Sequence, residues 1–402
     1  MDLTDTTGPR PDQPWTVIGV LSGTSYDAVD AAVADLFFEG REVVLRPRGL
    51  HTEPYPHWLR EQITACLPPA TTDLERVCRL DTGLGRFFGE VAARANTSLA
   101  HGGGELVVSH GQTVFHWVEG PQAHGTLQLG GAAWIAEATG LPVVSDLRSR
   151  DIARGGQGAP LAAMLDTLLL LGDGVRRGAL NLGGIANITV RDGRGEVIAY
   201  DLGPAGALID AVVSEATGGA ERMDTDGVRA ARGTVDGALL SELLTEPYFR
   251  LPPPKSTGKE LFHTDYLRQR LRGRQLSTDD LAATVTELTA RLVAAACHGH
   301  RLTELVASGG GVRNPVLMDR IRTLGAPTRI SRVEDYGLPA QAKEGYLFAL
   351  LGFLSVHGLA GTIASATGAR GGAVLGSVTP GARPLRLPAP RAEAPLRLRV
   401  ET

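Results

Sequence analysis

The chain has 402 residues and a formal net charge of -4, with 43% apolar and 21% charged residues. Its length exceeds that of a usual single hydrophobic core, so we expect two domains. The composition is that of a globular protein and not of a disordered or membrane-embedded one. A slightly negative chain offers no basic field, which excludes nucleic acid and anionic membranes as expected partners and favours a small molecule.

The first residues, MDLTDTTGPRPDQP, are acidic and proline-rich, unlike a secretory signal. No apolar run approaches the ~20 residues that a membrane helix needs. We therefore expect a cytoplasmic protein in which residues 1–13 form a disordered tail. Cys66, Cys78 and Cys297 are odd in number and lack metal-type spacing, which predicts reduced thiols and no disulfide framework.

Residues 15–36 combine an apolar run, a turn of small residues and an alternating run, which predicts a β-hairpin. Helical and strand patterns then alternate to the middle of the chain. The predicted elements of this half are helices at about 56–67, 72–99, 131–139 and 160–171, and strands at 106–109, 126–130 and 142–145.

A similar order recurs from residue 178, where GALNLGGIANITVRDGRGEVIAYDLG again predicts strands joined by glycine turns. The elements predicted after it are helices at about 205–217, 235–245 and 277–299, a strand at 304–308, and helices to about 323 and over about 340–357. Two related units indicate internal duplication. We expect an α/β protein with domain I at 14–175, domain II at 176–378, whose last segment can pack back on domain I, and an extended or disordered Pro/Arg-rich tail at 379–402.

The segment SGTSYDAVD follows the first predicted strand and has the composition of a phosphate cradle. Small residues let successive backbone N–H groups and hydroxyls converge on an anion, and a carboxylate there can face the metal that bridges phosphates. A plain hairpin turn explains the same composition. The residues of this predicted first phosphate loop are Ser22, Gly23, Thr24, Ser25, Tyr26, Asp27, Ala28, Val29 and Asp30, with Asp27 as the metal ligand.

Two further glycine-rich segments follow in the second half. LNLGGIANIT has the character of a second phosphate loop, and VASGGGVRNPVLM follows a strand and opens a helix, as a loop that lies against an adenosine ring would. Each is a weak signal alone, but three such elements in a duplicated chain are more specific. The residues concerned are Asn181, Gly183, Gly184 and Asn187 in the first segment and Gly309, Gly310, Gly311 and Asn314 in the second.

This order of elements resembles the actin-like superfamily of sugar kinases and chaperone ATPases, whose two ribonuclease H-like α/β domains face a central cleft. The motifs SGTSYDAVD, HGQT, TLQLG, DLRSRDIARGGQGAPL, LNLGGIANIT, DLGP and PPPKSTGKELF narrow the resemblance to the anhydro-N-acetylmuramic acid kinases over about residues 16–378. The chain departs from that family's pattern at Leu21, Tyr26, Ala28 and Ala205. The aspartates remain, so these departures bear on sugar preference and not on catalysis.

The resemblance implies a reaction in which water opens the 1,6-anhydro bridge while the freed O6 is phosphorylated, giving N-acetylmuramic acid 6-phosphate and ADP in cell-wall recycling. It implies ATP and Mg²⁺ as cofactors, an anhydro amino sugar as partner, and a homodimer. Asp201 matches the catalytic base and Glu344 an acid that holds the water or sugar. A helix N-cap is the alternative for Asp201, and a solvated helix residue for Glu344.

The same resemblance assigns sugar-contacting or scaffold roles to six residues of the first half, and Arg148 among them could pair with the lactyl carboxylate of the sugar. A salt link from Asp146 to Arg148, or from Arg150 to Asp151, is the alternative. These six residues are His110, Gln112, Thr113, Gln128, Asp146 and Arg148. Lys255 and Lys259, two of only three lysines in the chain, anchor a loop or the sugar, or lie in a proline-rich surface turn.

Two other functions stay open on the sequence alone. One is a kinase for another hexose or amino sugar within the same superfamily. The other is a non-catalytic actin-like nucleotide-binding protein, against which the presence of Asp27, Asp201 and GGQGAPL argues.

Overall fold

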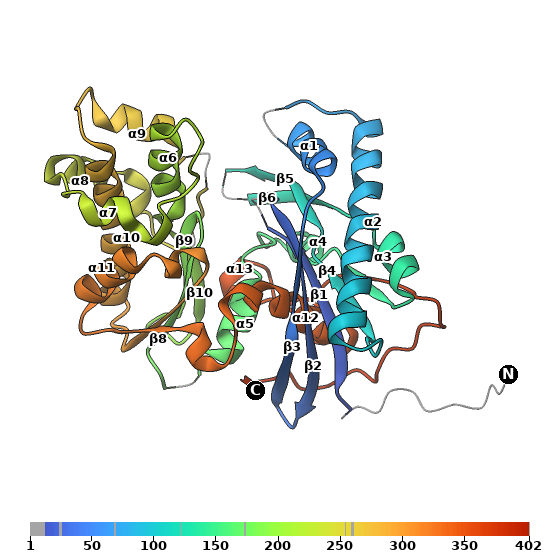
Figure 1. Ribbon diagram of the computed structural model, residues 1–402. Helices are drawn as coiled ribbons and strands as arrows, with labels where there is room; N and C mark the ends of the chain where they lie inside the picture. The colour runs from blue at the N-terminus through green and yellow to red at the C-terminus, as the bar shows by residue number, and fades with distance from the viewer. Residues whose placement is uncertain are drawn as a thin grey trace. The chain divides into compact units, whose positions relative to one another are not determined.

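The computed structural model describes residues 13–23, 26–67, 70–120, 122–172, 174–253, 255–258 and 261–401 (Figure 1). The chain divides into two compact units: unit 1 is Met1–Leu169 with Gly337–Thr402, and unit 2 is Leu170–Tyr336. In this division the first boundary lies at 169 and not at 175, and the segment after Tyr336 lies in unit 1, as the expectation that the last segment packs back on domain I allows. Most of the predicted tail at 1–13 lies outside the described residues. Among the helices that are described, none is both long and apolar enough to cross a membrane.

Unit 1 is built on a seven-stranded sheet with the order β13-β7-β4-β1-β2-β3-β14. Strands β1, β2 and β3 form an antiparallel meander, while β4 runs parallel to β1 and β7 parallel to β4. The strands are β1 (Trp15–Ser22), β2 (Ala28–Glu39), β3 (Glu42–Pro54), β4 (Leu106–Ser109), β7 (Val143–Ser145), β13 (Ser377–Thr379) and β14 (Arg397–Val400). A separate hairpin consists of β5 (Gln112–Glu119) and β6 (Gln122–Leu129).

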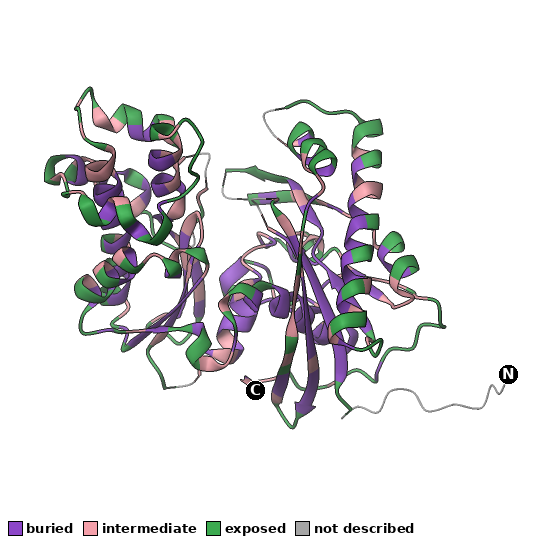
Figure 2. Cartoon of the chain, viewed as in Figure 1, coloured by how far each residue is buried: buried purple, intermediate pink, exposed green. Residues whose placement is uncertain are grey.

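Helices pack against this sheet. Helix α2 begins at the N-cap Asp73, whose side chain accepts a hydrogen bond from Arg76 N at 2.9 Å, and it buries Leu80, Leu84 and Phe88 at four-residue spacing. Figure 2 shows the buried face of α2 against the strands and its exposed face outward. The helices of unit 1 are α1 (His57–Cys66), α2 (Leu74–Leu99), α3 (Ala132–Thr139), α4 (Ser149–Ala153), α5 (Ala162–Leu169), α12 (Lys343–Val356) and α13 (Ala364–Thr367).

Helix α12 lies close on strands β1 and β2 because glycines meet at the contact. A Cβ atom added to Gly19 of β1 would lie 2.0 Å from Gly345 O, and one added to Gly345 would lie 2.5 Å from the Cβ of Ala32 in β2. Neither position can hold a larger residue without moving backbone. The first turn of α12, which carries Glu344, is thereby fixed on the strand that leads into the first phosphate loop.

Unit 2 has a five-stranded sheet with the order β10-β9-β8-β11-β12. Its strands are β8 (Arg177–Leu182), β9 (Ile185–Arg191), β10 (Val197–Pro204), β11 (Glu304–Ser308) and β12 (Arg329–Arg332). Helices α10 and α11 cover one apolar core with the sheet, and α6 to α9 form a second core with α10. The helices are α6 (Gly206–Ala216), α7 (Val228–Arg232), α8 (Gly237–Leu243), α9 (Thr264–Leu271), α10 (Thr278–Gly299) and α11 (Pro315–Gly325).

The predicted duplication is confirmed by the strand order. In unit 2 an antiparallel meander of β8, β9 and β10 is followed by β11 parallel to β8 and β12 parallel to β11. In unit 1 the antiparallel meander of β1, β2 and β3 is likewise followed by β4 parallel to β1 and β7 parallel to β4. Each unit therefore has the ribonuclease H-like arrangement expected of the fold class.

The predicted extended or disordered tail at 379–402 ends in a strand, while residues 380–396 contain no helix or strand. Strand β14 pairs parallel with β3, and Leu398 is buried there. The arginines that suggested a solvated tail instead meet carboxylates at this sheet edge: Arg399 pairs with Glu39 at 2.8 Å and with Glu42 at 3.3 Å. Their hydrocarbon stems and one apolar side chain are enough to hold a short edge strand.

Deleting residues 390–402 should lower the free energy of unfolding by about 2 kcal/mol or more, because burying a leucine side chain alone contributes about 1.5–3 kcal/mol. Urea denaturation followed by circular dichroism measures it. The exposed Arg397, whose contact with Glu42 spans 3.7 Å, provides the control, since Arg397→Ala should change stability by less than about 1 kcal/mol. An unchanged urea midpoint in the truncated protein would show that residues 390–402 do not stabilise the fold.

Candidate active site

The first predicted phosphate loop is shorter in the structure than in the sequence analysis. Strand β1 ends at Ser22 and β2 already begins at Ala28, so Ala28, Val29 and Asp30 lie in the sheet, with the Val29 side chain in the core. Tyr26 has φ 42° and its N–H donates to Gly23 O at 3.1 Å, which closes a tight turn. Thr24 and Ser25 lie outside the described residues.

Asp27 follows this turn and is half-exposed. Its carboxylate pairs with Arg60 of α1 at 2.8 Å, and the Arg60 guanidinium lies 5.8 Å from the centre of the Tyr26 ring. The part of the chain described here contains no cluster of three or more metal-ligating side chains. One accessible carboxylate fits Mg²⁺ bound mainly through phosphate oxygens and water, and does not fit a metal held in an all-protein cage.

Asp30, predicted to contact phosphate, is a residue of strand β2. Its carboxylate accepts a hydrogen bond from Thr52 Oγ1 at 2.6 Å, and burial raises its pKa. Ser22 donates to Gln112 Oε1 at 2.5 Å, which ties the end of β1 to the start of β5. Gln112 is buried, so it supports the loop and does not present its amide to solvent.

His110 and Arg148 form a second hydrogen-bonded contact between separate segments of unit 1, besides that of Ser22 with Gln112. Arg148 Nε donates to His110 Nε2 at 2.9 Å, so the proton of the imidazole lies on Nδ1, which donates to Gly111 O at 3.0 Å. Burial, and after it the charge of Arg148, lowers the pKa of His110 to about 3, which keeps the ring neutral. Arg148 Nη1 also donates to Gly158 O at 2.6 Å, so two guanidinium nitrogens already bind the protein.

The salt links considered as alternatives are absent among the ion pairs of the described residues. Asp146 has φ 56° and accepts hydrogen bonds from Ser149, with its Oγ at 2.6 Å. Asp151 is buried, and its carboxylate accepts from Gly158 N at 2.8 Å and from Thr367 Oγ1 at 2.9 Å. Local turns and buried backbone groups therefore use these carboxylates.

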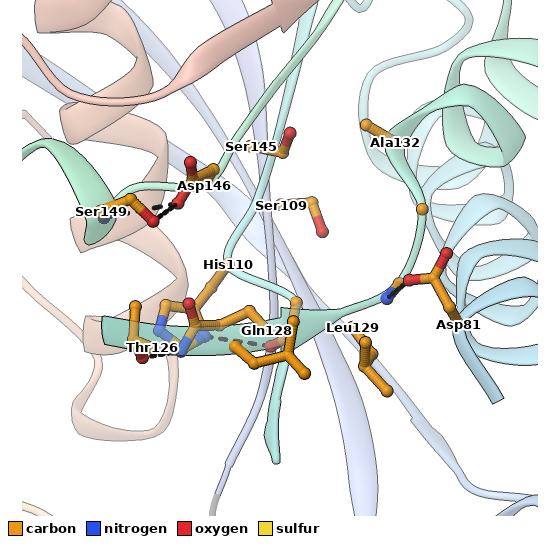
Figure 3. Close-up of a pocket in the computed structure, with 14 residues that line it drawn as sticks. Asp81, Ser109, His110, Thr126, Gln128, Leu129, Ala132, Ser145, Asp146 and Ser149 are labelled. Carbon is orange, nitrogen blue, oxygen red and sulfur yellow. Dashed lines mark hydrogen bonds between the residues drawn. The ribbon is translucent and has the colours of Figure 1, made fainter. Parts of the chain in front are cut away.

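A cavity of about 260 Å³ lies in unit 1 beside these residues. Figure 3 shows the carboxylate of Asp146 and the hydroxyls of Ser109 and Ser145 on its wall, with strand β6 along another side. Ser109 is buried, and its Oγ has no hydrogen-bond partner among the described residues. The lining residues are Asp81, Ser109, His110, Gly111, Thr126, Leu127, Gln128, Leu129, Gly130, Gly131, Ala132, Ser145, Asp146 and Ser149.

Three predicted sugar-contacting residues, His110, Gln128 and Asp146, line this cavity, whereas Gln112, Thr113 and Arg148 do not. Thr113 holds a residue of the cavity wall in place, since its Oγ1 accepts a hydrogen bond from Gln128 Nε2 at 3.2 Å. The cavity is thus polar, partly enclosed and bounded by hydroxyl, amide and carboxylate groups.

Glu344 lies in the first turn of α12, where a carboxylate favours the helix dipole. Its side chain keeps contact with solvent, yet the surrounding protein raises its pKa, first by desolvation and also through the charge of Asp30. Lys343 and Arg148 act in the opposite direction. A carboxyl group in these surroundings holds a proton more readily than a free glutamate does.

The second phosphate loop and the adenosine loop lie together in unit 2. Gly183 and Gly184 form the turn between β8 and β9. Asn181 and Asn187 lie opposite each other on the two strands that this turn joins. Gly309 has φ 88°, and a Cβ there would lie 2.5 Å from Asn181 Oδ1. A larger side chain would therefore separate the two loops.

The remaining adenosine-loop residues have defined places. Gly310 and Gly311 begin a 3₁₀ turn, and a Cβ on Gly311 would lie 2.8 Å from the Cβ of Leu182. Asn314 is the N-cap of α11, and its side chain accepts a hydrogen bond from Leu317 N at 3.0 Å. This cap places the start of α11 next to the glycines.

Asp201 lies within β10, directly across from Asn187 of β9. The alternative of a helix N-cap is wrong, because α6 begins at Gly206 with Ala205 as its N-cap. Ala205 N donates to Gly184 O at 2.9 Å, so the segment after Asp201 also holds the turn of the second phosphate loop. The structure thus groups Asp201 with that loop.

Three residues contact predicted site residues without having been predicted themselves. These are Arg60 beside Asp27, and Tyr248 and Thr257 beside Asp201. The motif PPPKSTGKELF contains Thr257, so a signal for that residue was present. Lys259 of the same motif lies outside the described residues.

Two α/β units that share the same order of their meander and parallel strands have the arrangement of an actin-like protein. The sequence model of the anhydro-N-acetylmuramic acid kinase family matches residues 15–381. The chain therefore belongs to the anhydro-N-acetylmuramic acid kinase family.

Curated relatives agree with this assignment. A protein of Streptomyces avermitilis named anhydro-N-acetylmuramic acid kinase is 57% identical over 388 residues, covering 96% of this chain and 100% of its own. A protein of Streptomyces coelicolor with the same name is 55% identical over 385 residues, covering 96% and 98%.

Solved structures are more distant. Component A of the (R)-2-hydroxyglutaryl-CoA dehydratase of Acidaminococcus fermentans matches with a TM-score of 0.41 and 12% identity, over 83% of this chain and 96% of its own. A ROK family glucokinase of Streptomyces griseus, in complex with glucose and AMPPNP, matches with a TM-score of 0.34 and 13% identity, over 83% and 97%.

Proposed function

We propose that this protein is an ATP-dependent kinase that hydrolytically opens the 1,6-anhydro ring of anhydro-N-acetylmuramic acid and phosphorylates O6. The products are N-acetylmuramic acid 6-phosphate and ADP, and the reaction serves the recycling of peptidoglycan. The observation that carries the proposal is family membership over residues 15–381. Asp201, held beside the second phosphate loop, supplies the carboxylate that this reaction needs.

The chemistry explains the need for a base. An anhydro sugar has no hydroxyl on O6, so a water molecule must attack C1 and lose its proton to a carboxylate, for which we propose Asp201. The bond between C1 and the bridging oxygen breaks, and this oxygen becomes O6. O6 attacks the γ-phosphorus of ATP, the bond from that phosphorus to the β,γ-bridging oxygen breaks, and ADP leaves.

Glu344 has surroundings that suit an acid that orients the water or a sugar hydroxyl. Desolvation raises its pKa, so it holds a proton more readily than a free glutamate does. The cavity of unit 1 supplies polar groups for the sugar, with Ser109 Oγ and the Asp146 carboxylate at its wall. Arg148 orients His110 and the loop at Gly158, and in this role it is a supporting residue.

Mg²⁺ belongs to the proposal as the ion that accompanies ATP, and Asp27 would be its protein ligand. When bound, it would neutralise charge that develops on the transferred phosphoryl group. The small residues of both phosphate loops would offer backbone N–H groups to the same phosphates. The homodimer implied by the family resemblance stays a prediction.

The test is ADP release with anhydro-N-acetylmuramic acid, compared with N-acetylglucosamine and glucose at equal concentrations. We expect sugar-dependent ADP formation with the anhydro sugar only. In ¹⁸O-labelled water the label should enter C1 of the product and not O6. Because the free hemiacetal exchanges its C1 oxygen slowly, product incubated in the same water is the control.

Turnover of glucose or N-acetylglucosamine without the anhydro sugar would instead identify a kinase for an ordinary hexose or amino sugar. ATP binding with no sugar-dependent turnover would identify a non-catalytic nucleotide-binding protein. Label at C1 no greater than in the control would exclude the hydrolytic route.

Asp27→Asn should raise the Mg²⁺ concentration for half-maximal turnover on the order of tenfold, because a neutral amide is a poorer ligand for a hard cation than a carboxylate. Titration of Mg²⁺ at saturating ATP measures it. Arg60→Ala is the matched control: it removes the partner of Asp27 and should not raise the Mg²⁺ requirement. An unchanged requirement in Asp27→Asn would remove this residue from the metal site.

A further inference from the structure

Asp201 is held by a segment far from it in the sequence. Asp201 N donates to Lys255 O at 3.1 Å, and Thr257 N donates to Asp201 Oδ2 at 2.9 Å. The short segment Lys255–Gly258 therefore binds both the backbone and the carboxylate of Asp201. A carboxylate oxygen bound in this way cannot rotate freely.

A third bond comes from the 3₁₀ turn at Pro247–Arg250. Tyr248 is buried, and its hydroxyl donates to Asp201 O at 2.9 Å. Asp201 also lies where β10 shifts register against β9, between Asp201 and Gly203. A bulge of this kind re-aims a side chain. Here two hydrogen bonds hold the main chain of Asp201 and one holds its carboxylate.

Lys255 is fixed against the same turn. Its ammonium donates to Tyr248 O and Phe249 O, both at 3.2 Å, and lies 4.7 Å from the centre of the Tyr248 ring and 5.9 Å from that of the Tyr200 ring. Three rotatable donors on a compact charge suit two neighbouring carbonyls, whereas the planar fork of arginine does not. This explains why a chain with 40 basic residues and only three lysines keeps a lysine here.

Lys255 and Asp201 are in direct contact through the main chain, since Asp201 N donates to Lys255 O at 3.1 Å. Burial lowers the pKa of Lys255, and the Asp201 carboxylate acts in the opposite direction. By the same interaction the ammonium favours the ionised carboxylate of Asp201. Among the described residues, Tyr248 from the 3₁₀ turn and Tyr200 from β10 are titratable groups that lie against the Lys255 ammonium, while Asn187 opposite Asp201 on β9 carries no charge.

We propose that Lys255–Gly258 positions the general base: the Thr257 N–H fixes the Asp201 carboxylate, and the Lys255 ammonium keeps that carboxylate ionised. The inference rests on the proposed function, in which Asp201 takes a proton from water. It assigns Lys255 a positioning role and not a contact with the sugar. Two of the three ammonium protons already bind carbonyl oxygens of the protein.

The experiment is the pH profile of kcat and kcat/KM for Lys255→Met. Loss of the positive charge should move the acid limb to higher pH by about 0.5 to 1 unit, because a nearby opposite charge favours the ionised carboxylate. Turnover below that limb should fall about 3- to 10-fold and recover towards the wild-type value at alkaline pH. KM for ATP should not change.

Two variants accompany it. Lys255→Arg keeps the charge and should keep the acid limb near its wild-type position, with a lower kcat because the fork fits the two carbonyls poorly. Arg250→Met removes one positive charge from an exposed position of the same 3₁₀ turn and should leave the profile unchanged. If Lys255→Met does not fold, Lys255→Gln retains amide donors for the two carbonyls and takes its place.

An acid limb that stays in place, or a loss of activity that is equal at every pH, would overturn the proposal. A second readout does not depend on turnover. In protein with ¹³C-labelled aspartate carboxyl groups, the Asp201 resonance, assigned by its absence in Asp201→Asn, should titrate at higher pH in Lys255→Met than in the wild type. If the wild type fails to turn over the anhydro sugar, the proposed function fails, while this titration still decides the role of Lys255.

Discussion

Replacing Asp201 by asparagine should lower turnover of anhydro-N-acetylmuramic acid by about 10² to 10⁴, the usual effect of losing a general base. Asparagine keeps the size of the side chain and can still accept a hydrogen bond from Thr257 N, but it cannot take a proton from water. Steady-state ADP release at saturating substrates measures the effect. Because the loss concerns the chemical step, it should appear in kcat, and the Kd of ATP should stay within about twofold.

Asp265 provides a matched control for this variant. It is an exposed aspartate of unit 2 that pairs with Arg268 at 2.9 Å, so Asp265→Asn makes the same chemical change away from the proposed site. Its turnover should be near wild type. Near wild-type turnover in Asp201→Asn would remove this residue from the role of base and leave Glu344 as the other carboxylate proposed for catalysis.

Lys343→Met should lower the free energy of unfolding by about 3 to 5 kcal/mol, the cost of breaking a buried ion pair. Lys343 Nζ lies 2.7 Å from Asp166 Oδ1, and both side chains are more than nine-tenths buried. The variant removes the Lys343 ammonium from beside the buried Asp166 carboxylate. Urea denaturation measures the loss, and the pair joins α5 to the start of α12.

The double variant Lys343→Met/Asp166→Leu tests the cause. With both charges of this pair removed, most of the lost stability should return. Arg79→Met breaks the exposed pair with Glu75 on α2 and should cost less than about 1 kcal/mol. A double variant that is no more stable than Lys343→Met would show that packing, and not charge, determines the effect.

The meander of unit 2 could be predicted from sequence more completely than that of unit 1. Glycine turns and alternating apolar residues mark β8, β9 and β10. In unit 1 the third strand, β3, was missed because Arg46, Pro47, Arg48 and Gly49 interrupt its apolar pattern. The strand forms nevertheless, since β2 supplies a long partner and a register shift at Val33 and Ala34 accommodates the irregularity.

The site could be predicted as a set of motifs but not as a set of contacts. The glycine-rich composition of short segments predicted the turns, and the family resemblance predicted Asp201 and Glu344. That Asn314 caps helix α11 was not predicted. Partners far apart in the sequence carry no local signal: Arg60 reaches Asp27 from a helix, and Asp166 reaches Lys343 from a helix in the first half of the chain. Only the folded chain determines which carboxylate such a cation meets.

Because α12 is the helix that lies on β1 and β2 through Gly19 and Gly345, one face of the first sheet stays uncovered until the last part of the chain has been made. Unit 2, which is one continuous segment, has all its strands and helices as soon as Tyr336 emerges. During synthesis the second unit can therefore fold before the first, against the usual order in which N-terminal domains fold first. Until then the apolar strands that begin the chain are the ones that need protection from aggregation.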